Sequence, residues 1–496
     1  MSATIIADGA TYSREELTQS ASQVAAGLAE AGIQEGDVVA VMLKNGIEYL
    51  EIIMACRQLG CYYCPINWHF TAPEIQYILD DSEAKALITT QVYFEPLQKT
   101  ISSKLSVWLT DTLDNKQNYA NWKAAQTSYQ GKPVSPRGHM AYTSGTTGKP
   151  KGVVRHAFPI EELSQRQAVA DSLVEEAYGL KPGVRALLSA PIYHSAPSLY
   201  AQVALRKADV FIITERFDPH QILQLIEKHQ IEAVYMVPIM YARLLRLDEE
   251  ERTSYDLSSL KFVVSTGSPC PPETKQAMMD WFGPVIYETY ASSEAGLVTL
   301  IRPDEVNSHP GSVGRPLANG IVRIYDDQGL LCPTGTVGRI FVHQPAYADF
   351  SYKGNTAARL DIEHEGLISL GDMGWIDEEG HLYVTDRESD MVISGGVNIY
   401  PAEIEQHLIQ HSDIADCVVI GIPDTEFGER LLALVQPLAN KTLDKDELRA
   451  WLKPRLAGFK IPRDFEFRAT LPRDDNGKIK KRAIRNTYWK DHTTKV

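Results

Sequence analysis

Cysteine is scarce in this sequence, with six residues among 496, which excludes the disulfide framework of a small secreted domain. Two of the six, Cys61 and Cys64, have the CxxC spacing found in some metal and redox sites. They end an apolar stretch, however, and no second CxxC accompanies them to complete a zinc site. We therefore predict that both are small side chains of the hydrophobic core.

Long apolar runs are also missing. No segment reaches the roughly 20 apolar residues that a helix needs to span a bilayer. The first residues, MSATIIADG, contain no basic region followed by an apolar one, as a secretory signal would. The expectation is a cytoplasmic protein without a membrane span.

Basic residues are in the minority. The 49 lysines and arginines and the 64 aspartates and glutamates give a formal net charge of −15. Such a charge disfavours a surface for nucleic acid or anionic lipid. Any site for a phosphate-bearing ligand must therefore be a local cluster.

The length and the residue pattern predict several domains with an α/β core. A chain of 496 residues is too long for one hydrophobic core. From Tyr12 to about residue 300, helical-period stretches alternate with short β-rich runs, which is typical of stacked parallel αβ subdomains. Strands are expected at 36–43, 186–190, 210–214, 233–237, 262–266 and 285–290, and helices at 47–59 and from Asp218-Pro219 onward.

The pattern of predicted strands, helices and turns changes twice in the last third of the sequence. From about Gly311, strands alternate with Gly-rich turns, as at 321–329 and 337–342, which predicts a small β-rich subdomain. The last residues have strands of their own at 417–422 and 431–436 and a helix near 445–456. We therefore expect a large N-terminal domain, 1–387, and a small α+β C-terminal domain, 388–496.

A glycine- and hydroxyl-rich stretch, YTSGTTGKPKG at 142–152, has the chemistry of a phosphate loop. It is not a Walker A motif, because two residues separate Gly145 from Gly148 where that motif needs four. Hydroxyls can donate to phosphate oxygens, lysines can neutralise their charge, and glycines permit close approach of the backbone. Taken alone, the stretch is also compatible with an ordinary solvated loop. The hydroxyls are those of Thr143, Ser144, Thr146 and Thr147, and the lysines are Lys149 and Lys151.

All eleven residues closely resemble the signature of the adenylate-forming superfamily, which includes acyl-CoA synthetases, luciferases and peptide-synthetase adenylation domains. Other segments that resemble family motifs follow in the family's order, from about residue 10 to 485. The resemblance implies a ligase that uses ATP and Mg²⁺ to convert a carboxylic acid to its acyl-adenylate, with release of pyrophosphate. It also implies that the C-terminal domain is mobile. Residues Thr143, Ser144, Gly145, Thr146, Thr147 and Lys151 would bind the phosphates.

The resemblance assigns the binding of adenine, the α-phosphate and magnesium to two further segments. Gly267, Ser268 and Pro269 look like the turn that lines adenine. In the segment YASSE at 290–294, Tyr290 would stack on adenine, Ser293 would touch the α-phosphate and Glu294 would bind magnesium. Ser293 stands where the family usually has threonine and keeps the hydroxyl. Ala291 replaces the usual glycine, and its extra methyl group narrows the expected acyl pocket.

Downstream segments resemble the parts of the family that bind ribose and join the two domains. Asp372 and Arg387 would bind the ribose hydroxyls, which suits a carboxylate that can accept two hydrogen bonds. Ser389 stands at the hinge position that is usually Asp or Lys. Gly395 and Gly396 resemble the loop that lines the thiol channel of CoA ligases.

Lys478 follows Asn476-Gly477, a strong signal for a tight hairpin turn. The family places its adenylation lysine after the same kind of turn, so the resemblance makes Lys478 catalytic. A carboxylate that attacks the α-phosphate of ATP meets like charge, and Lys478 together with Mg²⁺ on Glu294 would offset it. The alternative reading is a solvated basic hairpin, to which Lys480, Lys481 and Arg482 also belong.

The acid and the acceptor of the acyl group remain open. The segments 394–405 and 457–460 resemble CoA ligases, so CoA is the favoured acceptor, and a coronafacate-type amide ligase that uses an amino acid or amine is the alternative. His194 would border the acyl site and is a candidate base for an amine. A largely apolar acid is expected among Tyr193, His194, Val237, Pro238, Met240, Gly267 and Ala291.

Two other classes of protein are alternatives to a ligase. A non-catalytic nucleotide-binding protein would be expected to lack Lys478, Glu294 or Asp372, and all three are present. A luciferase-like oxygenase shares the scaffold and the first reaction, so the sequence leaves it open.

Overall fold

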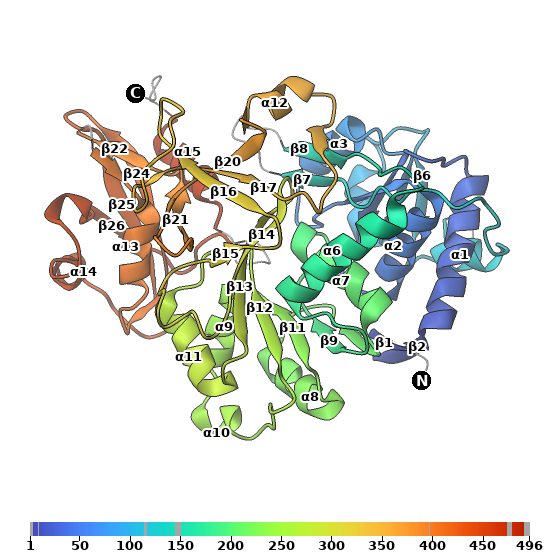
Figure 1. Cartoon of the computed structure of the whole chain (residues 1–496), viewed down its shortest axis with the longest axis horizontal. Coiled ribbons are helices and arrows are strands. Elements are labelled where there is room, and N and C mark those ends of the chain that lie inside the picture. The colour runs from blue at the N-terminus through green and yellow to red at the C-terminus, as the bar shows by residue number, and fades with distance from the viewer. Residues whose placement is uncertain are drawn as a thin grey trace. The chain divides into compact units, whose positions relative to one another are not determined.

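The computed structural model describes residues 3–7, 9–113, 117–143, 150–395, 397–473 and 479–490 (Figure 1). Its contacts divide the chain into two compact units, which are described separately. The first contains Met1–Ser308, Pro316–Ile321 and His343–Ile368, and the second contains His309–Arg315, Val322–Val342 and Ser369–Val496. Part of the β-rich segment thus groups with the C-terminal residues. The predicted domain division after residue 387 stays a prediction.

The larger sheet of the first unit has the order β14-β13-β12-β11-β9-β10-β1-β2. Its neighbours from β13 to β1 pair in parallel, which confirms the α/β prediction. The strands predicted at 186–190, 210–214, 233–237, 262–266 and 285–290 are all present in this sheet, with their ends shifted by at most two residues. The strands are β1 (Thr4–Ala7), β2 (Ala10–Ser13), β9 (Arg185–Leu188), β10 (Val210–Ile213), β11 (Ala233–Met236), β12 (Phe262–Ser265), β13 (Ile286–Ser292) and β14 (Gly296–Ile301).

Helices connect these strands, and all of them except α10 bury apolar side chains. They are α6 (Leu163–Tyr178), α7 (Ser195–Lys207), α8 (Pro219–His229), α9 (Pro238–Leu245), α10 (Glu249–Arg252) and α11 (Pro272–Phe282). In α8 the buried residues Ile222, Leu223 and Ile226 form one stripe. The helix begins as predicted, because Asp218 accepts a hydrogen bond from the backbone N–H of Gln221 at 2.9 Å and proline occupies the first position.

A second parallel sheet in the first unit has the order β4-β3-β5-β6. All five residues of β3 are buried, as expected of a parallel sheet covered on both faces. The predicted helix at 47–59 is α2, and Cys61 and Cys64 are buried free thiols, as predicted. The elements are α1 (Arg14–Glu30), β3 (Val38–Met42), α2 (Ile47–Leu59), β4 (Tyr62–Pro65), α3 (Ala72–Asp81), β5 (Ala86–Thr89), α4 (Gln91–Phe94), η1 (Glu95–Leu97), β6 (Ser106–Leu109) and α5 (Tyr119–Ala124).

The second unit contains the predicted β-rich subdomain and a mixed C-terminal sheet. In the β-rich subdomain, β16, β17, β20 and β21 are neighbours in that order. The C-terminal sheet has the order β23-β22-β25-β24, and β26 lies beside β25. The strands are β16 (Ile321–Tyr325), β17 (Gly338–His343), β20 (Leu367–Ile376), β21 (Leu382–Arg387), β22 (Val392–Ser394), β23 (Val397–Ile399), β24 (Ile414–Asp424), β25 (Gly428–Pro437) and β26 (Asp464–Phe467).

The C-terminal helices are α13 (Pro401–Leu408), α14 (Lys445–Leu452) and α15 (Lys481–Tyr488). The predicted helix at 445–456 is too long by four residues, since α14 ends at Leu452. Its C-cap, Lys453, keeps helical dihedrals, but Pro454 has no backbone N–H to continue the helical hydrogen bonds, so the helix ends here. Among the helices that the structure describes, none is both long and apolar enough to cross a membrane.

The cap of α8 can be tested directly. Asp218→Ala removes the side-chain acceptor for the Gln221 N–H, and we expect it to lower the free energy of unfolding by about 1 kcal/mol. Asp218→Asn keeps an oxygen at this position and should cost much less. Urea denaturation of both variants measures the difference, and equal loss in the two would contradict the capping role.

Candidate active site

The phosphate-loop residues join two strands of a small antiparallel sheet in the first unit. Its strands are β7 (Ala141–Thr143), β8 (Lys151–Arg155) and β18 (Phe350–Tyr352), with β8 in the middle. Thr143 pairs with Lys151 at the end of the hairpin, so these two predicted site residues are neighbours. The predicted residues Ser144, Gly145, Thr146 and Thr147, with Lys149, lie outside the described residues.

The carboxylate of Glu294 lies against this sheet. Glu294 follows β13, and its Oε1 accepts hydrogen bonds from the hydroxyls of Thr143 at 3.1 Å and Tyr352 at 3.2 Å. The structure thus brings together Thr143 and Glu294, which are both predicted site residues. Two hydroxyl donors on one oxygen fix the direction of the carboxylate, and an oriented carboxylate is a suitable ligand for a hard divalent cation.

Tyr352 is a site residue that the sequence analysis missed. Burial, followed by the neighbouring Glu294 carboxylate, raises the pKa of the Tyr352 phenol, so it remains a hydrogen-bond donor at neutral pH. The ammonium of Lys151 lies 5.0 Å from the centroid of its ring, within the range of a cation–π interaction. Tyr352 therefore connects the predicted phosphate-binding lysine with the predicted metal ligand.

A buried arginine holds the backbone at the same place. The guanidinium of Arg155 donates to the carbonyl oxygens of Ser293 and Glu294, both at 2.8 Å, and to that of Ala348 at 2.8 Å. Burial lowers the pKa of Arg155, but three carbonyl acceptors compensate for the lost water. This contact fixes the Ser293–Glu294 backbone and was also missed, because a lone arginine in a sequence gives no sign of burial.

The hydroxyl of Ser293 contacts the start of α7. Its Oγ lies 2.6 Å from the Oγ of Ser195, the first residue of that helix. The residue before it is His194, the N-cap of α7. The predicted α-phosphate contact, Ser293, and the predicted acyl-site residue, His194, thus belong to adjoining segments.

Asn45, also missed, anchors the loop that leads to His194. This buried amide donates to the carbonyl oxygens of Ala190 at 2.9 Å and Thr214 at 3.1 Å, and accepts from the N–H of Ile192 at 2.8 Å. One side chain therefore fixes the backbone on both sides of Pro191. Its effect is to hold the segment that carries Tyr193 and His194.

The predicted adenine turn is fixed at both ends to β13. The hydroxyl of Thr266 donates to the carbonyl oxygen of Thr289 at 3.1 Å, and the N–H of Cys270 donates to Oε1 of Glu288 at 3.1 Å. Because β12 and β13 are parallel neighbours, the turn at 267–269 leaves the sheet beside the end of β13, where Tyr290 lies. Gly267 has φ of 91°, a conformation that strongly favours glycine.

A buried ion pair supports this anchor. Lys275 of α11 and Glu288 of β13 are only 2% and 3% exposed and form a salt bridge. Burial by itself lowers the pKa of Lys275, but the Glu288 carboxylate outweighs it and raises that pKa. Removing two charges from water costs free energy. The ion pair that remains in the core fixes the direction of the Glu288 carboxylate.

The predicted acyl-site residues are largely buried. Tyr193, Val237 and Met240 are at most 6% exposed. Gly267 faces Val237, since a Cβ at this glycine would lie 4.0 Å from the Val237 Cγ1. The pairing of β13 with β14 shifts register between Tyr290 and Ala291, and such a bulge redirects the side chains that follow it.

In the second unit, the predicted ribose-binding residues form a cross-strand pair. Asp372 of β20 is opposite Arg387 of β21, and the Asp372 Oδ1 lies 3.1 Å from the Arg387 Nε. The neighbouring Asp386 accepts from the N–H groups of Arg387 and Ala402, and burial raises the pKa of Asp386 to about 6. Both carboxylates are therefore positioned by the β20–β21 hairpin.

The remaining predicted residues of the second unit are described only in part. The carbonyl oxygen of Ser389 accepts from Arg485 at 2.9 Å, and the N–H of Gly395 donates to the Phe427 carbonyl oxygen at 2.9 Å. Lys478 and Gly396 lie outside the described residues. Arg473 and Ile479 form an antiparallel bridge, as expected on either side of a hairpin turn.

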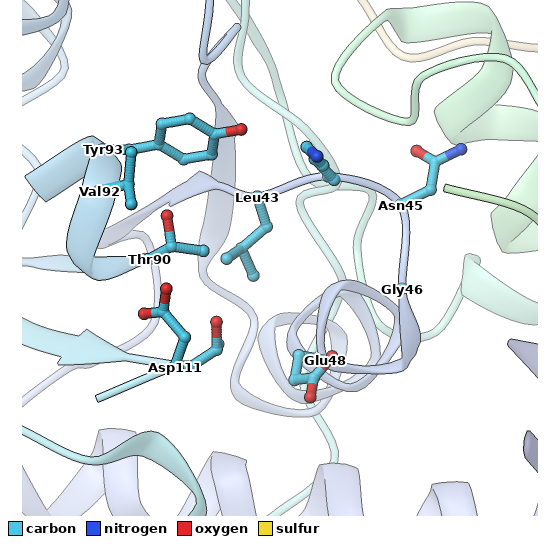
Figure 2. A pocket seen from close by; sticks show the side chains of 10 residues that line it. Leu43, Asn45, Gly46, Glu48, Thr90, Val92, Tyr93 and Asp111 are labelled. Carbon is cyan, nitrogen blue, oxygen red and sulfur yellow. The ribbon is translucent and has the colours of Figure 1, made fainter. Parts of the chain in front are cut away.

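A pocket of about 380 Å³ lies in the first unit, where the chain leaves β3, β5 and β6 (Figure 2). Residues of three connections line it: Leu43, Lys44, Asn45, Gly46, Glu48, Thr90, Val92, Tyr93, Thr110 and Asp111. None is a predicted site residue. In Figure 2 the Asn45 side chain points away from Tyr93, in agreement with its hydrogen bonds to the loop before His194.

Comparison with known proteins assigns the family. Residues 2–349 match the family model of AMP-binding enzymes, and residues 403–478 match that of the AMP-binding enzyme C-terminal domain. The chain belongs to the AMP-binding enzyme family. The predicted resemblance to the adenylate-forming superfamily is thereby confirmed, as is the prediction of an enzyme of the acid-ligase class.

Relatives of this family resemble the chain over nearly its whole length. A feruloyl-CoA synthase of Amycolatopsis sp is 33% identical over 485 residues, which cover 97% of this chain and 94% of that protein. The amide bond synthetase McbA of Marinactinospora thermotolerans has a TM-score of 0.86 and 26% identity, covering 98% and 97% of the two chains. The o-succinylbenzoate CoA synthetase MenE of Bacillus subtilis, in complex with ATP and magnesium ion, has a TM-score of 0.83 and 26% identity, covering 98% and 96%.

The contact between Tyr352 and Glu294 leads to a prediction. Tyr352→Phe removes one of the two donors to Glu294 Oε1 and keeps the ring beside Lys151. With Glu294 as the magnesium ligand, a loss of about 1 kcal/mol should raise the Mg²⁺ concentration for half-maximal AMP formation roughly fivefold. Steady-state rates against Mg²⁺ concentration measure this shift.

A matched control exists in the same unit. Tyr119 donates to the buried carboxylate of Glu51 at 2.9 Å, so Tyr119→Phe removes the same kind of hydrogen bond from a different glutamate. It should leave the Mg²⁺ dependence unchanged. An equal shift in both variants, or none in Tyr352→Phe, would refute the positioning role of Tyr352.

Proposed function

We propose that this protein uses ATP and Mg²⁺ to convert a carboxylic acid to an acyl-adenylate and then transfers the acyl group to the thiol of CoA. The observation that carries the first step is the Glu294 carboxylate, held by Thr143 and Tyr352 at the end of the phosphate-loop hairpin. The similarity to MenE in complex with ATP and magnesium ion supports the choice of nucleotide and metal.

The chemical problem of the first step is electrostatic. A carboxylate oxygen attacks the α-phosphorus and pyrophosphate leaves, so anionic groups must approach one another. Glu294 would hold Mg²⁺, which neutralises phosphate charge when bound. Lys151 and the residues at 143–147 would hold the departing pyrophosphate, and Ser293 would donate to the α-phosphate. The Arg155 contacts with the carbonyl oxygens of residues 293 and 294 keep these groups in place.

The nucleoside half is assigned on the family resemblance. Tyr290 would stack on adenine, with Gly267, Ser268 and Pro269 as the opposite wall. Asp372 and Arg387 would bind the ribose hydroxyls, and the existing Asp372–Arg387 pair supports this role, since the guanidinium fixes the direction of the carboxylate. Lys478 is proposed as the residue that bridges the acid and the α-phosphate. The C-terminal family match extends to this residue.

The second step attacks the carbonyl carbon of the acyl-adenylate and releases AMP. CoA is the favoured acceptor because residues 394–405 resemble the thiol channel of CoA ligases and a relative that is 33% identical is a feruloyl-CoA synthase. Closure of the C-terminal domain 388–496 about Ser389 would exchange Lys478 for the Gly395-Gly396 loop between the two steps.

An amide ligase is the second candidate, and one observation favours it. The amide bond synthetase McbA shares this fold with a TM-score of 0.86 over nearly the whole chain. An amine must reach the carbonyl carbon unprotonated, so this reaction needs a proton acceptor. His194, at the start of α7, is the candidate.

Product analysis separates the two candidates. The protein is incubated with Mg-ATP and a panel of aryl, aliphatic and cyclic acids, with CoA or mixed amines added in parallel. We expect AMP and pyrophosphate with at least one apolar acid, and a thioester with CoA, measured by mass spectrometry. Amide without thioester would overturn the CoA assignment, and no AMP with any acid would overturn the whole proposal.

Lys478→Ala tests the proposed division between the two steps. We expect it to reduce adenylation by at least about a hundredfold, because it removes the cation that offsets the attacking carboxylate. It should still convert a supplied acyl-adenylate to the final product. Lys480→Ala, two residues away, is the matched control and should retain both steps. Equal loss of both steps in Lys478→Ala would contradict the assigned role.

A further inference from the structure

A cluster of histidines and carboxylates lies in the second unit at the turn between β20 and β21. Asp377, Glu379 and His381 belong to the turn, and His309 approaches from an earlier segment. That segment is fixed beside β21, because Val313 donates to the Leu382 carbonyl oxygen and Leu382 donates to that of Gly314, both at 2.9 Å. Residues more than 60 positions apart are thus held together by backbone hydrogen bonds.

The ligand-type atoms of three of these side chains are close together. One ligand atom each of His309, Glu379 and His381 lies within 4.8 Å of the other two. The Nε2 of His309 is 3.1 Å from the Oε2 of Glu379. His381 is 1% exposed, whereas the Glu379 side chain is exposed to solvent. The cluster is therefore buried at His381 and open to solvent at Glu379.

We propose that His309, Glu379 and His381 bind one divalent transition-metal ion such as Zn²⁺. Two imidazoles and a carboxylate are ligands that zinc and its neighbours in the first transition series prefer, whereas Mg²⁺ prefers oxygen ligands alone. With metal–ligand bonds of about 2.0–2.2 Å, the ligand atoms of a tetrahedral zinc site lie roughly 3.3 Å apart. The His309–Glu379 distance already agrees with this value.

Binding requires one local movement. The rings of His309 and His381 are stacked, with centroids 3.6 Å apart and planes 21° apart, so the His309 ring must turn outward to aim at an ion shared with His381. His309 and Glu379 can supply this movement, since their side chains are 13% and 70% exposed. The buried His381 would remain in place.

Asp377 is suited to support the site and not to coordinate the ion. Its Oδ1 accepts from the N–H groups of Glu379 and His381 at 3.0 and 2.8 Å, and its Oδ2 accepts from the Tyr383 hydroxyl at 3.1 Å. The same carboxylate lies 3.6 Å from Nδ1 of His381 and 3.8 Å from Nε2 of His309. A carboxylate beside the ring nitrogen that does not bind a metal orients the imidazole, and Asp377 is placed to do this for His381 through Nδ1.

The test uses the full-length, untagged protein, stripped with EDTA and free of nucleotide. Zn²⁺ is titrated by isothermal calorimetry, and we expect one equivalent to bind to the wild type. His309→Ala and Glu379→Gln should each weaken binding at least tenfold. Glu378→Gln removes the adjacent exposed carboxylate of the same turn and should bind like the wild type. Circular dichroism of the metal-free variants checks that each is folded.

A spectroscopic measurement identifies the ligands. Electron paramagnetic resonance of the Cu²⁺ complex should report two nitrogen ligands in the wild type and in Glu379→Gln, and one in His309→Ala. The proposal is overturned if the wild type binds no stoichiometric ion, or if His309→Ala keeps the wild-type affinity and spectrum. These measurements do not use the ligase reaction, so their outcome is independent of the proposed function.

Discussion

The position of the Glu294 carboxylate is the constraint on which the rest of the candidate site depends. Three short strands meet there: β7 supplies the Thr143 hydroxyl, β18 supplies the Tyr352 hydroxyl, and β8 supplies the Arg155 guanidinium that holds the backbone. The register of this small sheet fixes all three donors relative to one another. When one oxygen of a carboxylate is held by hydrogen bonds, the carboxylate can bind a metal ion at a defined position. An exposed glutamate on a free loop cannot do so.

The parallel sheet provides the second fixed element. Strand β12 ends at Ser265, opposite Glu288 of β13, so the turn after Thr266 leaves the sheet beside the residues around Tyr290. The carboxyl edge of a parallel sheet is the usual place for a ligand in α/β proteins. Here the Lys275–Glu288 pair and the Thr266–Thr289 hydrogen bond fix that edge from within the core. The groups proposed to bind adenine are therefore positioned by buried contacts and not by the ligand itself.

Much of the fold could be predicted from local patterns. The strand at 38–42 and the helix at 47–59 follow from apolar runs and periodicity, and the start of α8 follows from the chemistry of Asp218-Pro219. The expected length of α14 was wrong, because the apolar pattern continues past the point where Pro454 ends the helix. The resemblance to family motifs also assigned Thr143 and Glu294 to one site, and Asp372 and Arg387 to another.

Tyr352, Arg155 and Asn45 could not be predicted in this way. Each acts through a contact between residues 58, 138 or 145 positions apart in the chain, and no local pattern encodes such a distance. Sequence motifs do not predict the acceptor of the acyl group either, because thioester and amide ligases share the residues that carry out adenylation. The choice of acceptor would be made in the acyl pocket around His194 and Ala291 and in the segment 394–405.

Acid-dependent exchange of labelled pyrophosphate into ATP reports acyl-adenylate formation without any acceptor. We expect Mg²⁺-dependent exchange with at least one apolar carboxylic acid, and its near-complete loss in Glu294→Gln, which keeps the size of the side chain and removes its charge. Exchange that persists unchanged in Glu294→Gln would show that this carboxylate does not hold the metal ion for adenylation.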